Sequence, residues 1–215
     1  MRAIVRGAPG HVRKELIMPE MHGVEKRVLA SRAWAAFSTR VVAPWVLRAG
    51  QLPAEADVLE VGSGGGGNVE VFTRRFPGWR ITASDYDPDM VDLARRRLEP
   101  LGERVTVSQA DASSLAFPDA TFDLVISIGV WHHVGDWRKA LAECARVLRP
   151  GGRLLLADLL AGFFPGPMKK LFPPQAPYRF TELRDALGPA GFARWRIRPL
   201  GGVGYRLLAE TQARS

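Results

Sequence analysis

A strand-like segment that runs into a series of glycines carries the strongest chemical signal in this sequence. The segment VLEVGSGGGG covers residues 58–67, and its apolar residues Val58, Leu59 and Val61 predict a buried strand with Glu60 inside it. Five of the next six residues are glycine, and a helical pattern follows at 68–76. Glycines let a ligand approach the backbone N–H groups at a helix N-terminus. We therefore expect a nucleotide-like ligand at this loop.

The same glycines fit the dinucleotide-binding pattern, as Gly62-x-Gly64-x-x-Gly67. Asp85 stands roughly 20 residues further on, where an acid that binds a ribose is expected. This interpretation predicts an NAD(P)-dependent reductase, and two observations disfavour it. The strand is preceded by 57 residues instead of opening the chain, and no tyrosine (Tyr86, Tyr178 or Tyr205) has a lysine four positions later.

Strand and helix patterns alternate through the middle of the chain, as a parallel sheet covered by helices requires. Strands are expected at 57–62, 80–85, 105–111, 122–129 and 153–159, and helices at 68–76, 88–98 and 137–148. Five prolines at 161–177 exclude a long helix there. A short helix is expected at 181–187 with Thr181 as its cap, and two strand-like runs meet at Gly201-Gly202, which predicts an antiparallel hairpin.

Several motifs in order along the chain resemble those of the class I S-adenosyl-L-methionine (SAM) methyltransferases. Glu60-x-Gly62-x-Gly64-x-Gly66 resembles the family's first motif. The family's second strand, acidic ribose ligand and next helix are resembled by ITASDYDPDMVDLARRRL (81–98). Its third strand, Asp-Ala adenine site and fourth strand are resembled by VSQADASSLAFPDATFDLVISIGVWHHV (107–134). Its Pro-Gly-Gly turn and fifth strand are resembled by RVLRPGGRLLLAD (146–158). The resemblance spans about 52–160. It implies an α/β fold with a Rossmann-like seven-stranded methyltransferase sheet, in which five parallel strands precede a C-terminal antiparallel hairpin and helices cover both faces.

The resemblance also implies that SAM is the cofactor and S-adenosylhomocysteine the product. The implied cofactor-binding residues lie at the ends of the first four strands: Glu60, Gly62, Ser63, Gly64, Asp85, Tyr86, Asp111, Ala112 and Ile128. In the family's pattern, Glu60 orients the glycine loop and the cofactor's amino group, and Asp85 accepts hydrogen bonds from the ribose. Tyr86 covers the adenine, while Asp111 and the Ala112 backbone bind its edge. An ordinary turn acid is the alternative interpretation of Asp111.

Two adjacent histidines, His132 and His133, follow the fourth predicted strand. A histidine with an unperturbed pKa near 6.5 can take a proton from a phenol, enol or ammonium nucleophile, so both are candidate general bases. The sequence does not separate the two, and packing at a helix start is the alternative role. Methyl transfer from a sulfonium depends mainly on alignment of the reacting atoms, so we expect catalysis chiefly by positioning. We expect no metal, because the four histidines lack partners at ligand spacing.

Charge divides the chain into three parts. Residues 1–50 carry nine Lys/Arg against three Asp/Glu, residues 51–160 twelve against sixteen, and residues 161–215 nine against three. We expect a basic, largely helical N-terminal extension or lid at 1–50, with a break at Pro44. A SAM-binding domain follows at 51–215, with a Pro/Phe/Lys-rich insert on the substrate side at 161–180. The single cysteine, Cys144, excludes a disulfide framework and favours a core position in a cytoplasmic protein.

The expected partner is a small-molecule or lipid substrate. No recognisable nucleic-acid module is present, so nucleic acid is not expected. The chain is similar both to quinone-biosynthesis methyltransferases and, in its basic and aromatic flanks, to the bacterial phospholipid N-methyltransferases. The acceptor is therefore either a phospholipid amine such as phosphatidylethanolamine at an anionic membrane surface, with peripheral attachment of the enzyme, or a soluble natural product or quinone. Neither the acceptor atom nor the oligomeric state follows from the sequence.

Overall fold

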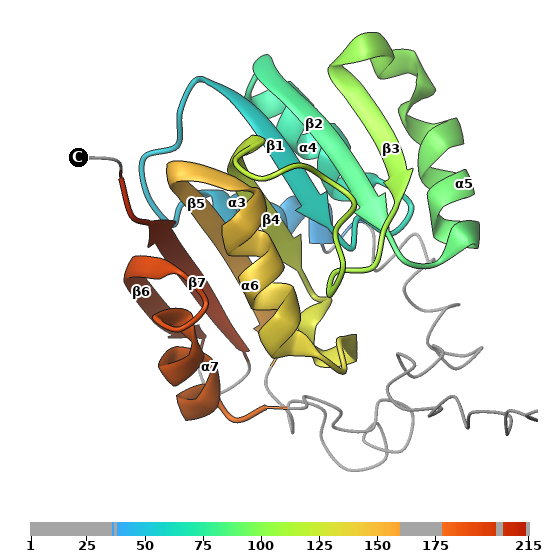
Figure 1. Ribbon diagram of the computed structural model, residues 1–215. Helices are drawn as coiled ribbons and strands as arrows, with labels where there is room; N and C mark the ends of the chain where they lie inside the picture. Colours follow the sequence, from blue (N-terminus) through green and yellow to red (C-terminus); the bar gives the residue numbers. More distant parts are fainter. Residues whose placement is uncertain (1–35, 37, 160–177, 201–203, 214–215) are drawn as a thin grey trace, which may run out of the picture.

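The computed structural model describes residues 36, 38–159, 178–200 and 204–213. They form a seven-stranded sheet in the order β3-β2-β1-β4-β5-β7-β6 (Figure 1). Its strands are β1 Glu55–Val61, β2 Gly78–Asp85, β3 Val105–Gln109, β4 Phe122–Ile128, β5 Leu148–Leu159, β6 Phe192–Leu200 and β7 Gly204–Thr211. Strands β1 to β5 are parallel, whereas β7 runs antiparallel to both β5 and β6. This is the Rossmann-like methyltransferase sheet that the sequence predicts.

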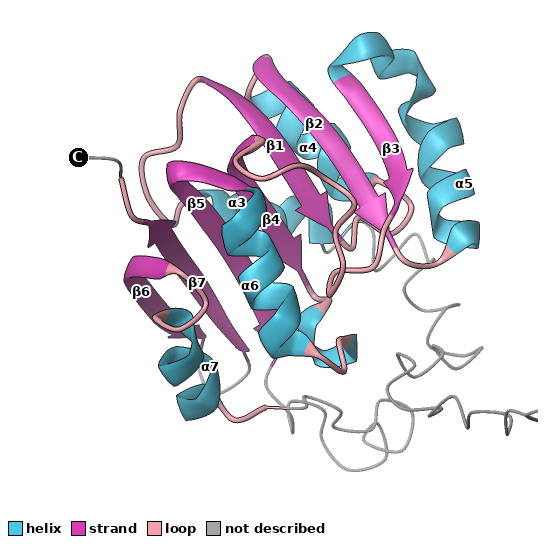
Figure 2. Ribbon diagram, in the orientation of Figure 1, coloured by secondary structure: helices cyan, strands magenta, loops and turns pink. Residues whose placement is uncertain are grey.

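Helices cover both faces of this sheet (Figure 2). The α-helices are α3 Ala43–Leu47, α4 Gly67–Arg75, α5 Pro88–Leu98, α6 Trp137–Val147 and α7 Phe180–Leu187. The π-helix η1 spans Ser38–Val42, and the 3-10 helices are η2 Glu99–Arg104 and η3 Trp131–His133. Helices α6 and α7 lie on one face, and α3, α4 and α5 on the other. Among the described helices, none is both long and apolar enough to cross a membrane.

Strand β1 contributes to the core on both of its sides. Leu59 and Val61 pack under α6, while Ala56 and Val58 pack under α3 and α4. Side chains alternate along a strand, so Glu60 faces the same side as Val58, toward α4. All four apolar side chains are buried, which explains the nearly continuous apolar run in the sequence.

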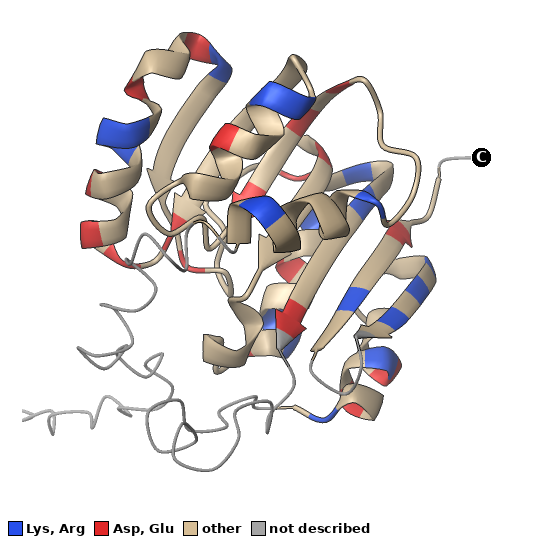
Figure 3. Cartoon of the chain, turned by 180° about the vertical axis from the view of Figure 1, so that it is seen from behind, with Lys and Arg blue, Asp and Glu red and all other residues tan. Residues whose placement is uncertain are grey.

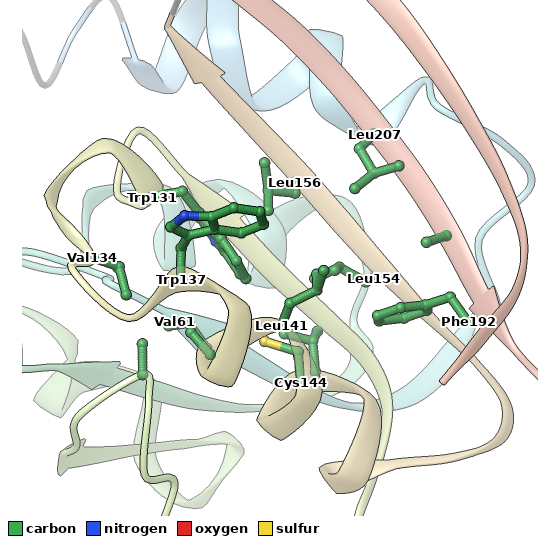
Figure 4. Close-up of a cluster of buried hydrophobic side chains, with 14 of the residues drawn as sticks. Val61, Trp131, Val134, Trp137, Leu141, Cys144, Leu154, Leu156, Phe192 and Leu207 are labelled. Carbon is green, nitrogen blue, oxygen red and sulfur yellow. The ribbon is translucent and has the colours of Figure 1, made fainter. Parts of the chain in front are cut away.

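The core under α6 contains the single cysteine. Cys144 is fully buried beside Leu141 and Leu154, as Figure 4 shows, and burial raises the pKa of its thiol to about 12. A thiol in this environment is neither a nucleophile nor a metal ligand. The prediction of a packing role for Cys144 is confirmed.

The helix boundaries confirm most predictions and correct one. Asp87 caps α5, with its side chain accepting the backbone N–H of Asp89 at 2.9 Å. Helix α7, however, begins at Phe180, and Thr181 is not its cap. The Glu182 carboxylate reaches back to the Arg179 backbone N–H at 2.7 Å, which makes Arg179 the capping position. At the predicted break, the π-helix η1 gives way to α3, which has Pro44 in its first turn.

The C-terminal hairpin carries part of the positive charge of the 161–215 segment. Arg194, Arg196 and Arg198 stand at alternate positions of β6, all exposed, on the outer strand of the sheet (Figure 3). Arg194 forms an ion pair with Glu210 of β7 at 2.7 Å. Charged side chains on an edge strand hinder pairing with other chains, so these arginines have a structural explanation. Of the predicted insert at 161–180, only residues 178–180 are described by the structure. The part of the predicted N-terminal extension before residue 36 also lies outside the described residues.

Candidate active site

The candidate site lies at the carboxyl ends of the parallel strands, which meet along one edge of the sheet (Figure 1). The chain adds β2 and β3 on one side of β1 and then returns to place β4 on the other side. In open α/β sheets, ligands bind in the crevice at such a reversal of strand order. The glycine loop leaves β1 at this point, and the predicted residues on β2, β3 and β4 end beside it.

The glycine loop packs closely against the segment that follows β4. Gly62 has φ +75°, and a β-carbon at this position would lie 2.2 Å from Val130 Cγ2. The N–H groups of Gly62 and Ser63 both donate to Ser84 O at 2.8 Å, which ties the loop to β2. At Gly64, which has φ +52°, an added β-carbon would meet nothing within 4 Å. Gly62 is therefore required for packing, whereas the side of Gly64 is open for a ligand to approach.

Glu60 is a buried carboxyl group directly behind this loop. Its side chain is fully buried, and neither carboxylate oxygen has a hydrogen-bond partner among the described residues. Burial raises the pKa of Glu60 to about 8; the Asn68 amide, which lies near the carboxyl without hydrogen-bonding geometry, opposes the shift, and the negative charge of Asp85 adds to it. A buried carboxyl without a partner suits a ligand that brings a positive charge, such as the ammonium group of SAM.

Asp85 lies at the end of β2, with its carboxylate directed toward the glycine loop. Its Oδ2 accepts the Gly64 N–H at 2.7 Å, and Oδ1 accepts the Asp87 N–H at 3.0 Å. Burial raises the pKa of Asp85, and these backbone hydrogen bonds oppose the effect. Each carboxylate oxygen can accept a second hydrogen bond, which leaves acceptors for two ribose hydroxyls. Tyr86, the next residue, is 46% exposed, as a side chain that covers a ligand would be.

Asp111 shapes the turn after β3. Its Oδ1 accepts hydrogen bonds from the Ser113 N–H at 2.8 Å and from Ser113 Oγ at 2.9 Å, and its backbone carbonyl accepts the Ser114 N–H. The turn-acid interpretation is therefore correct for Oδ1, and the predicted adenine contact would have to use Oδ2. Ala112 is buried in the core under α6.

The end of β4 joins the glycine loop to β5. Ser127 Oγ donates to Val61 O at 2.9 Å, and the Gly129 N–H donates to Ala157 O at 2.8 Å. Ile128 lies between these two bonds and is half-buried. The predicted cofactor residues of β1, β2 and β4 are thus brought together at one edge, with Asp111 on the next loop along it.

The structure separates the two histidines. The Nδ1 atom of His132 lies 2.7 Å from Asp158 Oδ1, its backbone N–H donates to Asp158 Oδ2 at 2.8 Å, and its side chain is 23% exposed. His133 is buried, and burial, together with the charge of His132, lowers its pKa to about 4. A base that remains neutral down to that pH is a weak one. His132 is therefore the better candidate for the general base.

Asp158 is a functional candidate that the sequence interpretation missed. It stands one residue before the end of the predicted fifth strand, and the fourth predicted strand is followed by His132. The carboxyl ends of neighbouring parallel strands meet at one edge, so adjacency of β4 and β5 would have brought the pair together. The described residues contain no cluster of three or more His, Cys, Asp or Glu side chains that could hold a metal ion.

Comparison with known proteins identifies a family for this region. Residues 59–156 match the model of a methyltransferase domain. The demethylmenaquinone methyltransferase of Thermus thermophilus is 37% identical over 115 residues, which cover 54% of this chain and 50% of that protein. The chain thus spans about half the length of the curated relatives that it matches.

Solved structures share the fold over a longer range. A SAM-dependent methyltransferase from Aquifex aeolicus superposes with a TM-score of 0.70 and 24% identity, over 86% of this chain and 96% of that one. The phosphoethanolamine N-methyltransferase 2 of Haemonchus contortus, in complex with phosphomonomethylethanolamine and S-adenosylhomocysteine, gives a TM-score of 0.71 and 16% identity, over 89% of this chain and 58% of that one. At these identities the likeness shows the fold.

Proposed function

The chain contains a class I methyltransferase domain, and from this premise we propose that it transfers a methyl group from SAM to a hydroxylated aromatic acceptor of the quinol type. The observation that carries the proposal is the open side of Gly64, bordered by the buried and unpartnered Glu60 and by Asp85. This arrangement offers a buried carboxyl group that the ammonium group of a cationic cofactor would ionise, and it offers hydrogen-bond acceptors for the ribose.

The residues present fit SAM. Glu60 would face the ammonium group, the Gly62–Gly64 backbone the methionine portion, and Asp85 the ribose, while Tyr86 and Asp111 would contact the adenine. When bound, SAM supplies a methyl group on a positively charged sulfur, which keeps the electron pair of the C–S bond that breaks. The contribution of the chain is to align the acceptor with that methyl group and to exclude water.

His132 supplies the base in this proposal. The Nδ1 atom is engaged by Asp158, which holds the ring proton there and leaves Nε2 as the basic nitrogen. Nε2 would take the proton of an acceptor hydroxyl, which would leave a phenolate that is nucleophilic at its oxygen and at the ring carbons next to it; methylation at such a carbon would be completed by loss of that carbon's proton. Val130 lies two residues earlier and packs against Gly62, which places this turn beside the glycine loop.

The quinol type of acceptor is favoured by the demethylmenaquinone methyltransferases among the relatives. A proton on a phenol must leave before or during transfer, and a histidine base serves that need. A phospholipid amine such as phosphatidylethanolamine at an anionic membrane is the competing acceptor, and peripheral membrane attachment belongs to that alternative.

A label-transfer assay tests the proposal. The protein is incubated with methyl-labelled SAM and a lysate that contains membranes, and the organic extract is resolved into quinones and phospholipids. A parallel reaction uses 1,4-naphthalenediol as a defined probe. Label in quinones and in the probe is the expected result. Label in phospholipids would replace the quinol acceptor by a lipid amine, and label confined to the aqueous phase would exclude both.

Thermal unfolding with added ligand tests the cofactor separately. We expect S-adenosylhomocysteine to raise the melting temperature, and NADH or NADPH at the same concentration to leave it unchanged. Stabilisation by a nicotinamide cofactor alone would return the chain to the reductase interpretation.

A further inference from the structure

Asp158 is a buried carboxylate that forms two hydrogen bonds with the η3 turn. Its side chain is fully buried near the end of β5. Oδ2 accepts the His132 backbone N–H at 2.8 Å, and Oδ1 lies 2.7 Å from His132 Nδ1. Two bonds from one carboxylate to the backbone and the ring of the same residue fix both the position of the turn and the direction of the imidazole.

Two tyrosines extend this contact into a chain of hydrogen bonds. Tyr178 donates its hydroxyl proton to Asp158 Oδ2 at 3.3 Å, and the hydroxyls of Tyr178 and Tyr205 lie 2.6 Å apart. A tyrosine has one hydroxyl proton, so if Tyr178 gives its proton to Asp158, Tyr205 must be the donor to Tyr178. Burial, with the charge of Asp158, raises the pKa of both tyrosines far above the usual range, so they remain protonated donors.

Packing fixes these groups in place. Asp158 and Tyr205 are register partners on β5 and β7, and both tyrosines are buried. The Trp137 ring of α6 lies against Tyr178 with centroids 5.0 Å apart, and the Phe180 ring of α7 meets Tyr205 edge-on at 5.8 Å. Strand β7 and the side chains of Trp137 and Phe180 therefore hold the two tyrosines in place, and reorganisation around the carboxylate during a proton transfer would be small.

We propose that Asp158, supported by Tyr178 and Tyr205, is a positioning residue that sets the tautomer of His132 and stabilises the imidazolium formed when His132 takes a proton. The inference rests on the proposed function, in which His132 is the base. Among the described residues, Asp158 from β5 and His133 within η3 lie against the His132 ring, while Tyr178 before α7 and Tyr205 from β7 are hydrogen-bonded to Asp158 and to each other. Asp158 is the acid of this set. The negative charge of Asp158 favours protonation of the His132 ring. A positive charge on the neighbouring His133 would oppose that protonation.

The first experiment needs no turnover. In the free, full-length protein with ¹⁵N-labelled histidine, two-bond ¹H–¹⁵N correlation spectra report which ring nitrogen carries the proton. We expect the Nδ1–H tautomer for His132 in the wild type. In Asp158→Asn we expect the tautomer to change and the titration midpoint of His132 to fall by at least about one pH unit, because an opposite charge in contact has been removed. An unchanged tautomer and midpoint would overturn the inference, whatever the enzyme methylates.

The second experiment compares kcat with 1,4-naphthalenediol and labelled SAM. Asp158→Asn should lower kcat by about 100-fold or more, since the base loses its orientation, while KM for SAM changes by less than about threefold. In a His132→Gln background, Asp158→Asn should cause no further loss. Full additivity of the two changes would instead assign Asp158 a role unrelated to His132 and overturn the inference.

Two tyrosine variants guard against a general loss of folding in Asp158→Asn. Tyr178→Phe removes the donor to Asp158, whereas Tyr205→Phe removes only the outer donor, and each deletes one hydroxyl. We expect a roughly tenfold loss of kcat for Tyr178→Phe and about a threefold loss for Tyr205→Phe, with similar melting temperatures. Equal effects of both variants on kcat would contradict the chain of donors. If the wild type methylates neither the probe nor quinones, the proposed acceptor fails, and the spectra alone decide the role of Asp158.

Discussion

The two halves of the candidate site are built in different ways. At the ends of β1 to β3, the cofactor half consists mainly of backbone: the Gly62–Gly66 loop, held by Ser84 carbonyl and Asp85 carboxylate. At the ends of β4, β5 and β7, the acceptor half consists of side chains: His132, Asp158, Tyr178 and Tyr205. The first is suited to a ligand common to many enzymes, whereas the second can be altered one side chain at a time to suit an acceptor.

The halves also differ in how their carboxyl groups are satisfied. Glu60 is buried without a partner, while Asp158 is buried with several donors around it. Burial of a carboxyl group without hydrogen-bond donors costs free energy, which a bound cationic ligand would offset. A buried carboxylate that already has donors instead fixes the positions of the groups that donate to it. Substitutions that distinguish the halves should therefore separate cofactor binding from turnover.

The largest effect is expected in the acceptor half. His132→Gln should lower kcat by about 100- to 10,000-fold, the usual contribution of a general base, with the affinity for S-adenosylhomocysteine retained. The measurement is single-turnover methyl transfer to 1,4-naphthalenediol across pH. His133→Gln is the matched control in the neighbouring position. It should lower kcat by less than about tenfold, because the buried ring has a pKa of about 4 and does not serve as the base. Equal losses for the two variants would remove the distinction between the histidines.

In the cofactor half, Glu60 should make stability depend on pH. The folded pKa of about 8 lies above the ordinary value of 4.5, so the folded state holds a proton that the unfolded chain releases between these values. Stability is therefore lost as pH rises from about 5 to 8, by on the order of a few kcal/mol. Glu60→Gln should abolish this loss, as urea unfolding at pH 5, 6, 7 and 8 would show. Parallel curves for the two proteins would mean that Glu60 is ionised in the fold.

His133 should impose the opposite slope. Its folded pKa of about 4 lies below the ordinary value of 6.5, so the unfolded chain takes up a proton first, and stability is lost as pH falls through this window. In Glu60→Gln this decline at acid pH should remain, whereas it should disappear in His133→Gln. The two variants thus serve as controls for each other.

The sequence predicts the cofactor half better than the acceptor half for a physical reason. Gly62 must be glycine because its φ is positive and Val130 occupies the space of a side chain, and such a requirement is visible in the sequence. Asp85 follows at a spacing set by one helix and one strand. The order of strands and the predicted hairpin follow in the same way, from alternation and turn residues.

The acceptor half depends on which strands become neighbours. The sequence predicts a hairpin, but it is the second strand, β7, that lies beside β5, with Tyr205 opposite Asp158. Nothing in the local pattern marks Tyr178 or Tyr205 as a polar partner for an acid 20 or more residues earlier in the chain. The wrong cap at Thr181 has a different, local cause, since the Glu182 carboxylate accepts the backbone N–H of Arg179, three residues earlier.

Glycine substitutions sharpen the description of the cofactor half. Gly62→Ala introduces a strained φ and a contact of 2.2 Å with Val130, so we expect a loss of about 2–4 kcal/mol in the free energy of unfolding. Gly64→Ala introduces strain alone and should cost about 1–2 kcal/mol, but its new methyl group should weaken ligand binding. Urea unfolding and calorimetry with S-adenosylhomocysteine measure the two effects. Adding Val130→Ala should recover part of the stability of Gly62→Ala, and no recovery would mean that backbone strain dominates there.

The last substitution in this series concerns the ribose contact of Asp85. Asp85→Asn keeps the size of the side chain but removes its charge, which weakens each charge-assisted hydrogen bond to a ribose hydroxyl. The dissociation constant of S-adenosylhomocysteine, measured by calorimetry, should rise by about 10- to 100-fold, equivalent to roughly 1.4–2.7 kcal/mol. Asp92→Asn is the control, because Asp92 is an exposed acid on α5 that pairs only with Arg95 among the described residues. Because Asp85 also accepts the Gly64 N–H, loss of affinity without loss of melting temperature is the result that assigns the carboxylate to the ligand instead of to the loop. An unchanged affinity would show that the ribose lies elsewhere, and the cofactor half would then consist of the glycine loop and Glu60 alone.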